Sequence, residues 1–180
     1  MTSDPLDLYG RASEWTLSKV VGAGSNLAAR TPCDDWDVRA LMNHMLDTEQ
    51  YFAGRARGRD VAPPSPNPPQ LLGDDPAVDF ERARNDMLST FSEKGTIEKT
   101  GPSLTVAFCD QLLHGWDLAR ATRQDATMPV GLADAAYEFI HGMLGENQRK
   151  GAFKPEVPVL PTASAQDRLL GFTGRDPAGG

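Results

Sequence analysis

The chain has 180 residues, of which 39% are hydrophobic, and this is enough material for one core of ordinary size. Lys and Arg number 18 against 25 Asp and Glu, so the formal net charge is −7, and no basic block interrupts the chain. The composition therefore argues against a nucleic-acid or anionic-membrane partner. We expect a single domain spanning residues 1–180.

The first ten residues, MTSDPLDLYG, lack the basic segment and apolar run of a signal peptide. No segment approaches the roughly 18 consecutive apolar residues of a membrane span, so we expect a cytoplasmic protein. The two cysteines lack CxxC spacing, which argues against a disulfide framework and against a sulfur-rich zinc site. We expect Cys109 in the core and Cys33 in a loop.

Helical periodicity dominates the sequence wherever a period is visible. Apolar positions predict a first helix over residues 8–27. Asp37 is the expected N-cap of a second helix of about twenty residues. The segment 61–76 follows, and it has five prolines between positions 63 and 69. Proline lacks a backbone donor and favours extended chain, so we expect a long solvated loop here.

The second half of the chain continues the helical pattern. A third helix is predicted over residues 78–91, and a fourth from an N-cap at Ser103 to about Thr122, with residues 95–101 as the connection. A fifth helix is expected over residues 132–144.

Near the C-terminal end, Ser164 and Asp167 match a capping box before a short helix through Leu170. Strand-like alternation is confined to short pieces such as 157-VPVL-160. The helices and their apolar faces predict an all-α protein. We expect a DinB-like antiparallel four-helix bundle around one core, with additional short helices and a Pro-rich loop.

One stretch of the fourth helix, 108-FCDQLLHGWDLARATRQD-125, concentrates groups that can do chemistry. Asp110 and His114 are four residues apart, so on a helix they share a face, with Cβ atoms about 5–6 Å apart. His44 lies beside the apolar stripe of the second helix. If the two helices face each other, His44 completes a set of two histidines and one carboxylate.

Such a set suits zinc, and also nickel, iron or manganese, because these ligands discriminate weakly among the ions. Three protein ligands leave a coordination position for water or substrate, as in reactive zinc sites. The spacing of Asp110 and His114 equally fits a hydrogen-bonded pair or a solvated helix face, and His44 alone fits a satisfied core histidine. From the residues alone these interpretations stay open.

The neighbours of the histidines have two interpretations as well. Asp117 and Arg120 follow His114 by three and six residues, and they can orient a metal-bound imidazole or form an exposed salt bridge with each other. Asp47, three residues after His44, is a candidate for the same orienting role.

Other aromatic residues are expected to be structural. Trp36 and Trp116 are predicted to pack in the core, with the wall of a substrate pocket as the alternative. His141 is expected to be structural. On the fifth helix, Phe139 and Met143 are candidates for the contact of a homodimer.

Three motifs lie in order over nearly the whole chain: 31-TPCDDWDVRALMNHM-45, 110-DQLLHGWDLARATRQD-125, and a tail from 151-GAFKPEVPV to 166-QDRLLGFTGRDP-177. Together they resemble an uncharacterised metal-binding family of mycothiol-using bacteria. That family belongs to the DinB-like superfamily, beside mycothiol-dependent maleylpyruvate isomerase.

The resemblance implies a DinB-like bundle with one divalent metal ion, usually zinc or nickel. It assigns the ligands to His44, in an L-x-x-H context, and to the acid-x-x-x-histidine pair Asp110 and His114. Two positions depart from the pattern. The isomerase relatives have glutamate in place of Asp110, and relatives commonly have glycine in place of Arg123, at a helix end that favours the left-handed conformation.

With the resemblance, the leading hypothesis is a metal-dependent enzyme that deprotonates a small thiol, mycothiol, for S-transfer to an electrophile or for isomerisation. The thiol and the electrophilic substrate follow from the relatives, because no residue here specifies either. The alternatives are a non-enzymatic metal-binding bundle acting in sensing, storage or partner binding, and a hydrolase that uses metal-bound water.

Overall fold

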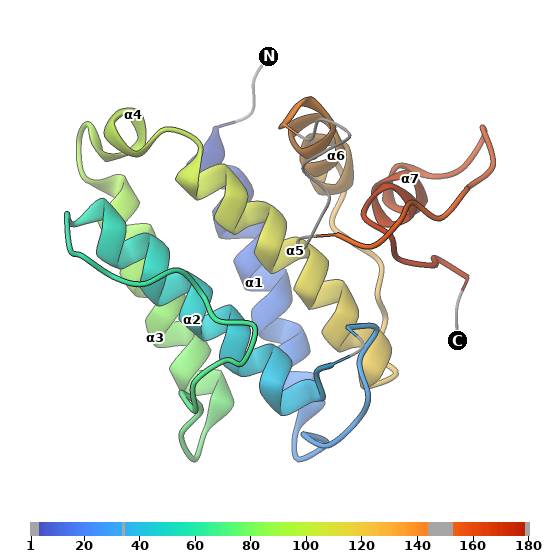
Figure 1. The fold of residues 1–180 in the computed structure, drawn as a ribbon, viewed down its shortest axis with the longest axis horizontal. Coiled ribbons are helices and arrows are strands. Elements are labelled where there is room, and N and C mark those ends of the chain that lie inside the picture. The colour runs from blue at the N-terminus through green and yellow to red at the C-terminus, as the bar shows by residue number, and fades with distance from the viewer. Residues whose placement is uncertain (1–3, 34, 144–152, 179–180) are drawn as a thin grey trace. The chain divides into compact units, whose positions relative to one another are not determined.

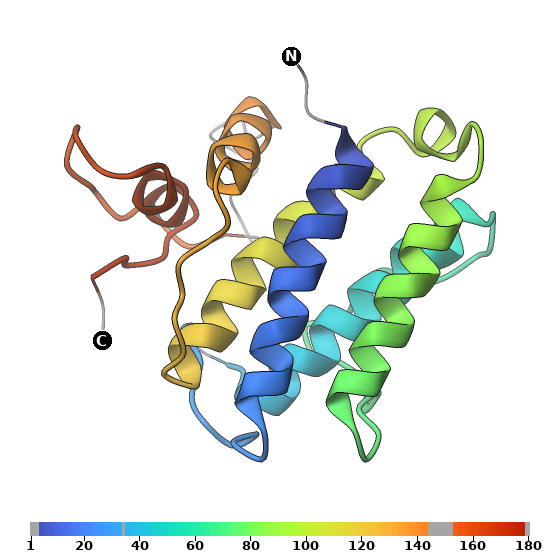
Figure 2. The same ribbon diagram turned by 180° about the vertical axis from the view of Figure 1, so that it is seen from behind.

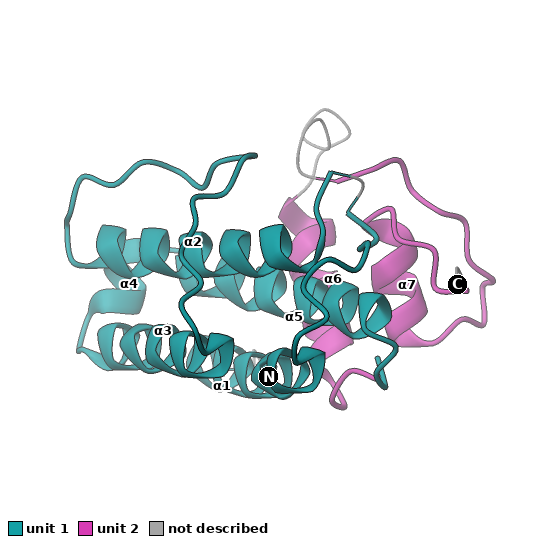
Figure 3. Cartoon of the chain, turned by 90° about the horizontal axis from the view of Figure 1, so that it is seen from below, with its two compact units in different colours: residues 1–126 teal, residues 127–180 magenta. Residues whose placement is uncertain are grey.

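The structure is a computed structural model that describes residues 4–33, 35–143 and 153–178. The chain divides into two compact units, residues 1–126 and 127–180, which Figure 3 distinguishes by colour. The first unit contains α1 (Pro5–Ala23), α2 (Val38–Ala56), α3 (Pro76–Ser92), α4 (Thr96–Thr100) and α5 (Ser103–Ala121), and the second contains α6 (Leu132–Met143) and α7 (Ala165–Phe172). The described residues contain no β-strand, which confirms the all-α class. That residues 1–180 act as one domain stays a prediction.

Four long helices of the first unit form a bundle in which each helix packs against two others (Figures 1 and 2). The contacts join α1 to α5, α5 to α2, α2 to α3 and α3 to α1. In the ribbon, α1 and α5 run in one direction while α2 and α3 run in the other, so α2 and α5 are antiparallel neighbours. The candidate ligands on α2 and α5 therefore lie on facing helices.

The proline-rich loop is explained by the direction of the helices. Because α2 and α3 are consecutive and parallel, the chain between them must return along the bundle. A helix of 19 residues is about 28 Å long, and extended proline-rich chain covers about 3.1 Å per residue. Residues 59–75 contain no helix and run back along α2 in Figure 1. Proline suits this segment because it keeps the returning chain extended.

Side chains of α2 hold the loop in place. The buried Oδ1 of Asn43 accepts the backbone N–H groups of Leu71 and Leu72 at 2.6 and 2.9 Å. The Oδ2 of Asp47 accepts the N–H of Ser65 at 3.1 Å. Asp47 is thus an anchor of the loop, a contact that the sequence did not predict.

Capping residues set the starts of several helices. Asp37 caps α2 and Ser164 caps α7 as predicted, since their side-chain oxygens accept backbone N–H groups at 2.8 and 3.1 Å. Asp4 and Asp75 cap α1 and α3 in the same way. The cap at Asp4 starts α1 a few residues before the predicted range 8–27, and the helix also ends earlier.

The connection into α5 differs from the prediction. Residues 95–101 include the short helix α4, which leaves only two residues between α4 and α5. An N-cap needs extended backbone, and there is no room for it at Ser103. Ser103 is instead the first residue of α5, Pro102 occupies the cap position, and the Ser103 hydroxyl donates to the carbonyl of Thr100 at 2.9 Å.

In the second unit, α6 and α7 pack against each other. The helix α6 begins at Leu132 as predicted, while the predicted end at Leu144 lies outside the described residues. Residues 157–160 form no strand, and the N–H of Val157 donates to the carbonyl of Gly171, near the end of α7, at 2.9 Å. No helix in the described part of the chain is both long and apolar enough to cross a membrane.

Candidate metal centre

The structure brings the three candidate ligands together between α2 and α5. The Nε2 of His44 and the Nε2 of His114 each lie 3.6 Å from the same oxygen, Oδ1 of Asp110. One ligand atom from each residue lies within 4.8 Å of the other two. The side chains of His44, Asp110 and His114 are 14%, 18% and 12% exposed, so the cluster is sheltered but still reachable by a small molecule.

These separations fit a shared cation better than direct hydrogen bonds. A distance of 3.6 Å exceeds the usual N–H···O range of about 2.7–3.2 Å. Two atoms that each bind a tetrahedral zinc ion at about 2.0–2.1 Å lie about 3.3 Å from each other. The two distances to Oδ1 of Asp110 are therefore close to the separation expected for ligands of one ion. Two imidazoles and a carboxylate fit zinc, and nickel as well.

Asp117 fixes the orientation of His114. Its Oδ2 lies 2.9 Å from the Nδ1 of His114, and its side chain is fully buried. Because an ionised carboxylate only accepts hydrogen bonds, the proton of the neutral imidazole lies on Nδ1 and the lone pair is left on Nε2. This short contact with His114 supports the orienting role considered for Asp117, and that role at a bound metal stays a prediction.

A second group of potential metal ligands also includes His114. The thiol of Cys33 donates to the Oδ2 of Asp117 at 3.4 Å, so this oxygen receives both the thiol and the imidazole. Cys33, His114 and Asp117 thus also have ligand-type atoms within 4.8 Å of one another. The sequence placed Cys33 in a loop, and nothing in its spacing indicated this neighbour.

His44 is held by an aromatic ring. The ring of Trp36 lies 4.4 Å from the His44 imidazole, centroid to centroid, and 6.1 Å from that of His114. The Nδ1 of His44 is buried and has no hydrogen-bond partner among the described residues. Burial works to lower the pKa of His44, but the carboxylates of Asp110 and then Asp47 outweigh it, so the pKa is raised above its usual value.

Trp116 and His141, which the sequence analysis also considered, contact side chains other than the candidate ligands. Trp116 is 3% exposed, and the Arg120 guanidinium lies 5.7 Å from the centroid of its ring. His141, in the second unit, contacts the rings of Tyr137 and Phe172 at 5.4 and 5.2 Å between centroids. Trp116 is therefore a core residue, as expected, whereas the half-buried Trp36 contacts the candidate ligands.

The sequence analysis missed a buried acid in the bundle. The hydroxyl of Tyr9 on α1 donates to Oε1 of Glu49 on α2 at 2.5 Å, and the two residues are 0% and 2% exposed. Burial, with smaller effects of Asp110 and Asp86, raises the pKa of Glu49 to about 8, although the Tyr9 hydrogen bond and Arg84 lower it. Glu49 follows Met45, a residue of the apolar stripe of α2, by four positions. This helical spacing was the signal in the sequence that could have indicated a buried Glu49.

The fold and the cluster define a helical bundle with an open set of two histidines and one carboxylate between facing helices. The model of the mycothiol maleylpyruvate isomerase N-terminal domain family matches residues 11–119, which include all three candidate ligands. The chain belongs to this family, which confirms the resemblance of its motifs. Membership supports a DinB-like, metal-binding bundle with a mycothiol-related role.

Relatives of nearly the same length are found in Mycobacterium tuberculosis. The chain is 26% identical to Uncharacterized protein Rv0738 of strain H37Rv and to Uncharacterized protein MT0763 of strain CDC 1551. Each alignment covers 96% of this chain and 98% of the relative. No solved structure gave a significant match.

Proposed function

We propose that the protein is a metal-dependent enzyme that uses a small thiol, mycothiol, for S-transfer or isomerisation. In this proposal His44, Asp110 and His114 hold one divalent ion, with zinc expected and nickel as the alternative. The observation that carries it is the approach of two imidazole nitrogens to one Asp110 oxygen, at 3.6 Å each, in a chain of this family.

A divalent ion in this position supplies Lewis acidity, which lowers the pKa of a thiol and favours its nucleophilic thiolate form. The residues of the chain prepare the position. Asp117 keeps the His114 proton on Nδ1, so that Nε2 is available for binding. The ring of Trp36 covers part of His44 and restrains the imidazole, while three protein ligands leave room for a substrate atom.

Metal analysis of the purified protein tests the ligand assignment. We expect about one equivalent of zinc or nickel in the wild type, and its loss in the double variant His44→Ala, His114→Ala. His141→Ala is the matched control, because it removes the third histidine, whose ring contacts Tyr137 and Phe172 of the second unit, and it should keep the metal. A double variant that retains a full equivalent would refute the assignment.

Metal affinity tests the orienting role of Asp117. We expect Asp117→Asn to weaken zinc binding by about 10- to 100-fold, because an orienting carboxylate fixes the tautomer of its histidine. The measurement is competition with a chromophoric chelator at constant pH. An unchanged affinity would contradict the role, provided that circular dichroism shows the variant to be folded.

The reaction is tested by incubating metal-loaded protein with mycothiol and either a halo-dinitrobenzene or maleylpyruvate. We expect metal-dependent conjugation or isomerisation that is absent from the His44→Ala, His114→Ala variant. Tight metal binding without any thiol-dependent turnover would refute the enzymatic proposal in favour of a non-enzymatic metal-binding bundle. Metal-dependent hydrolysis that needs no thiol would favour a hydrolase instead.

A further inference from the structure

Thr48 lies on the face of α2 that carries His44, one turn further along the helix. Residues four positions apart share a helical face, with Cβ atoms about 5–6 Å from each other. The Cα–Cβ bonds of a helix tilt toward its N-terminus, so the Thr48 side chain leans toward His44. Because His44 meets Asp110 of α5 on this face, Thr48 follows the candidate metal centre by one turn of α2.

The hydroxyl of Thr48 is not used by the fold. Thr48 is 5% exposed, and its Oγ1 is buried without a hydrogen-bond partner among the described residues. A threonine hydroxyl in a helix can donate to the carbonyl four residues earlier. Other threonines in or at the end of the described helices do so, at 2.6–2.9 Å: Thr90, Thr100, Thr122 and Thr173.

A buried hydroxyl of this kind needs an explanation. Taking a hydroxyl out of water without giving it a partner costs free energy, so such groups are rare in native proteins. Valine has the same branched shape and would avoid this cost. The hydroxyl of Thr48 therefore suits a partner that enters the protein from outside.

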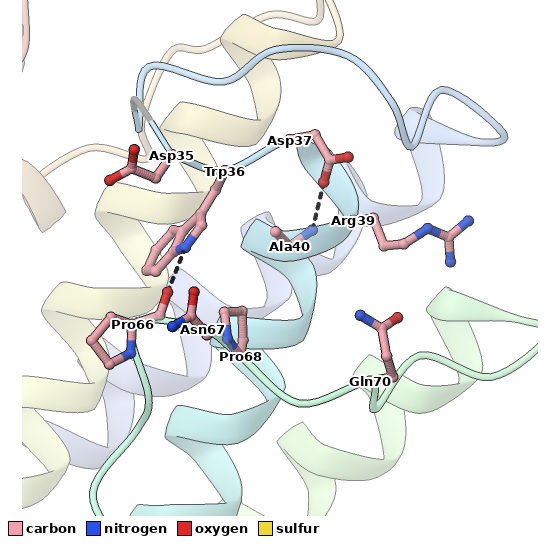
Figure 4. Close-up of a pocket in the computed structure, with 9 residues that line it drawn as sticks. All are labelled: Asp35, Trp36, Asp37, Arg39, Ala40, Pro66, Asn67, Pro68 and Gln70. Carbon is pink, nitrogen blue, oxygen red and sulfur yellow. Dashed lines mark hydrogen bonds between the residues drawn. The ribbon is translucent and has the colours of Figure 1, made fainter.

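Two other donors near the histidines are already used. The Nε1 of Trp36 donates to the carbonyl of Pro66 at 3.0 Å, as the dashed line in Figure 4 shows. The thiol of Cys33 donates to Asp117. Thr48 thus offers a hydroxyl donor to a ligand at the centre.

We propose that the Thr48 hydroxyl donates a hydrogen bond to the sulfur of the thiol that binds at the candidate metal centre. The inference rests on the proposed function, in which an ion on His44, Asp110 and His114 binds this sulfur as a thiolate. A hydrogen bond to a charged acceptor is stronger than one between neutral groups, so the hydroxyl favours the thiolate over the thiol. Thr48 is not a base near neutral pH, and its role is to bind the sulfur.

Binding of 2-mercaptoethanol to the cobalt(II)-loaded full chain tests this role, because a sulfur–cobalt bond absorbs in the near ultraviolet. We expect Thr48→Val to keep the cobalt affinity within about twofold and to bind the thiol about tenfold more weakly, through loss of a hydrogen bond to a charged acceptor. Thr48→Ser keeps a hydroxyl and should restore most of the thiol affinity. Thr90→Val is the matched control, because Thr90 is buried on α3 and its hydroxyl is used within that helix. It should leave both affinities unchanged.

Urea unfolding of the metal-free proteins gives a second measurement that needs no ion. Because the Thr48 hydroxyl is buried without a partner among the described residues, we expect Thr48→Val to unfold at a higher urea concentration than the wild type. Thr90→Val loses an existing hydrogen bond, so its midpoint should not rise. An unchanged or lower midpoint for Thr48→Val would overturn the proposal, because the hydroxyl would then have a partner in the free protein.

The binding results separate this inference from the proposed function. Equal thiol affinities of the wild type and Thr48→Val, with cobalt tightly bound, would overturn the role of Thr48 and leave the metal centre standing. Equal losses in Thr48→Val and Thr48→Ser would also overturn it, because the hydroxyl would then not be the group that binds. A chain that binds no cobalt would overturn the proposed function and this inference together.

Discussion

Replacement of Glu49 by glutamine tests the physical account of the buried acid. The pKa of Glu49 is about 8, against an ordinary value of 4.5. At about 1.36 kcal/mol per pKa unit, this difference corresponds to roughly 5 kcal/mol of folding free energy. That is a large part of the roughly 5–15 kcal/mol by which a native domain is stable.

The sign of the effect follows from the raised pKa. Over the pH range between 4.5 and about 8, folded Glu49 keeps a proton that the unfolded chain releases. Its contribution to stability is therefore complete below pH 4.5, falls as the pH rises to about 8, and changes little above that. Glutamine still offers an oxygen to the Tyr9 hydroxyl but cannot ionise, so the variant lacks this dependence.

We expect the wild type and Glu49→Gln to have similar free energies of unfolding at about pH 5. At about pH 8.5, we expect Glu49→Gln to be more stable by several kcal/mol. The assay is urea unfolding followed by far-UV circular dichroism across this pH range. Glu81→Gln is the matched control, because Glu81 is exposed on α3, and its difference from wild type should not vary with pH. A constant difference between wild type and Glu49→Gln would refute the reasoning.

Three further variants test packing, backbone conformation and thiol exposure. Gly115→Ala should cost about 1–3 kcal/mol in urea unfolding, because its Cβ would lie 2.7 Å from a tryptophan ring carbon of α1. Gly10→Ala, with 3.8 Å of clearance, should not destabilise, and equal losses would contradict this account. Arg123→Gly should gain about 1 kcal/mol, since Arg123 has φ 59°, and a loss would contradict this. In a thiol titration of the native protein, Cys33 should react. Cys109 should not react, because it is buried and burial raises its pKa. Labelling of the native Cys33→Ser variant would contradict this expectation, because Cys109 is its remaining cysteine.

The long helices, two of their caps and one left-handed residue could be predicted from the sequence, because such features depend on residues that are close together in the chain. Helical periodicity found the long helices, and Asp37 and Ser164 were recognised as caps because a cap acts within one turn. Arg123 was recognised as the residue in place of a left-handed glycine, and it has that conformation. Ser103 was misassigned because the short helix α4 has no apolar periodicity that would have shown how little room precedes α5.

The pairing of residues from different helices was decided by the tertiary structure. The sequence could place Asp110 and His114 on one helical face, but His44 joined them only on the condition that α2 and α5 face each other. The packing of α2 against α5 meets that condition, and the ring of Trp36 lies against that of His44.

The surroundings of the candidate ligands depend on contacts between residues far apart in the chain. Cys33 meets Asp117 across 84 positions, and Tyr9 meets Glu49 across 40. No local pattern encodes such contacts, because their distances are set by how the helices pack. The sequence by itself therefore determined which helices form, which family the chain resembles and which residues could bind a metal. Only the packed bundle decided which side chains orient those residues and which acid is buried.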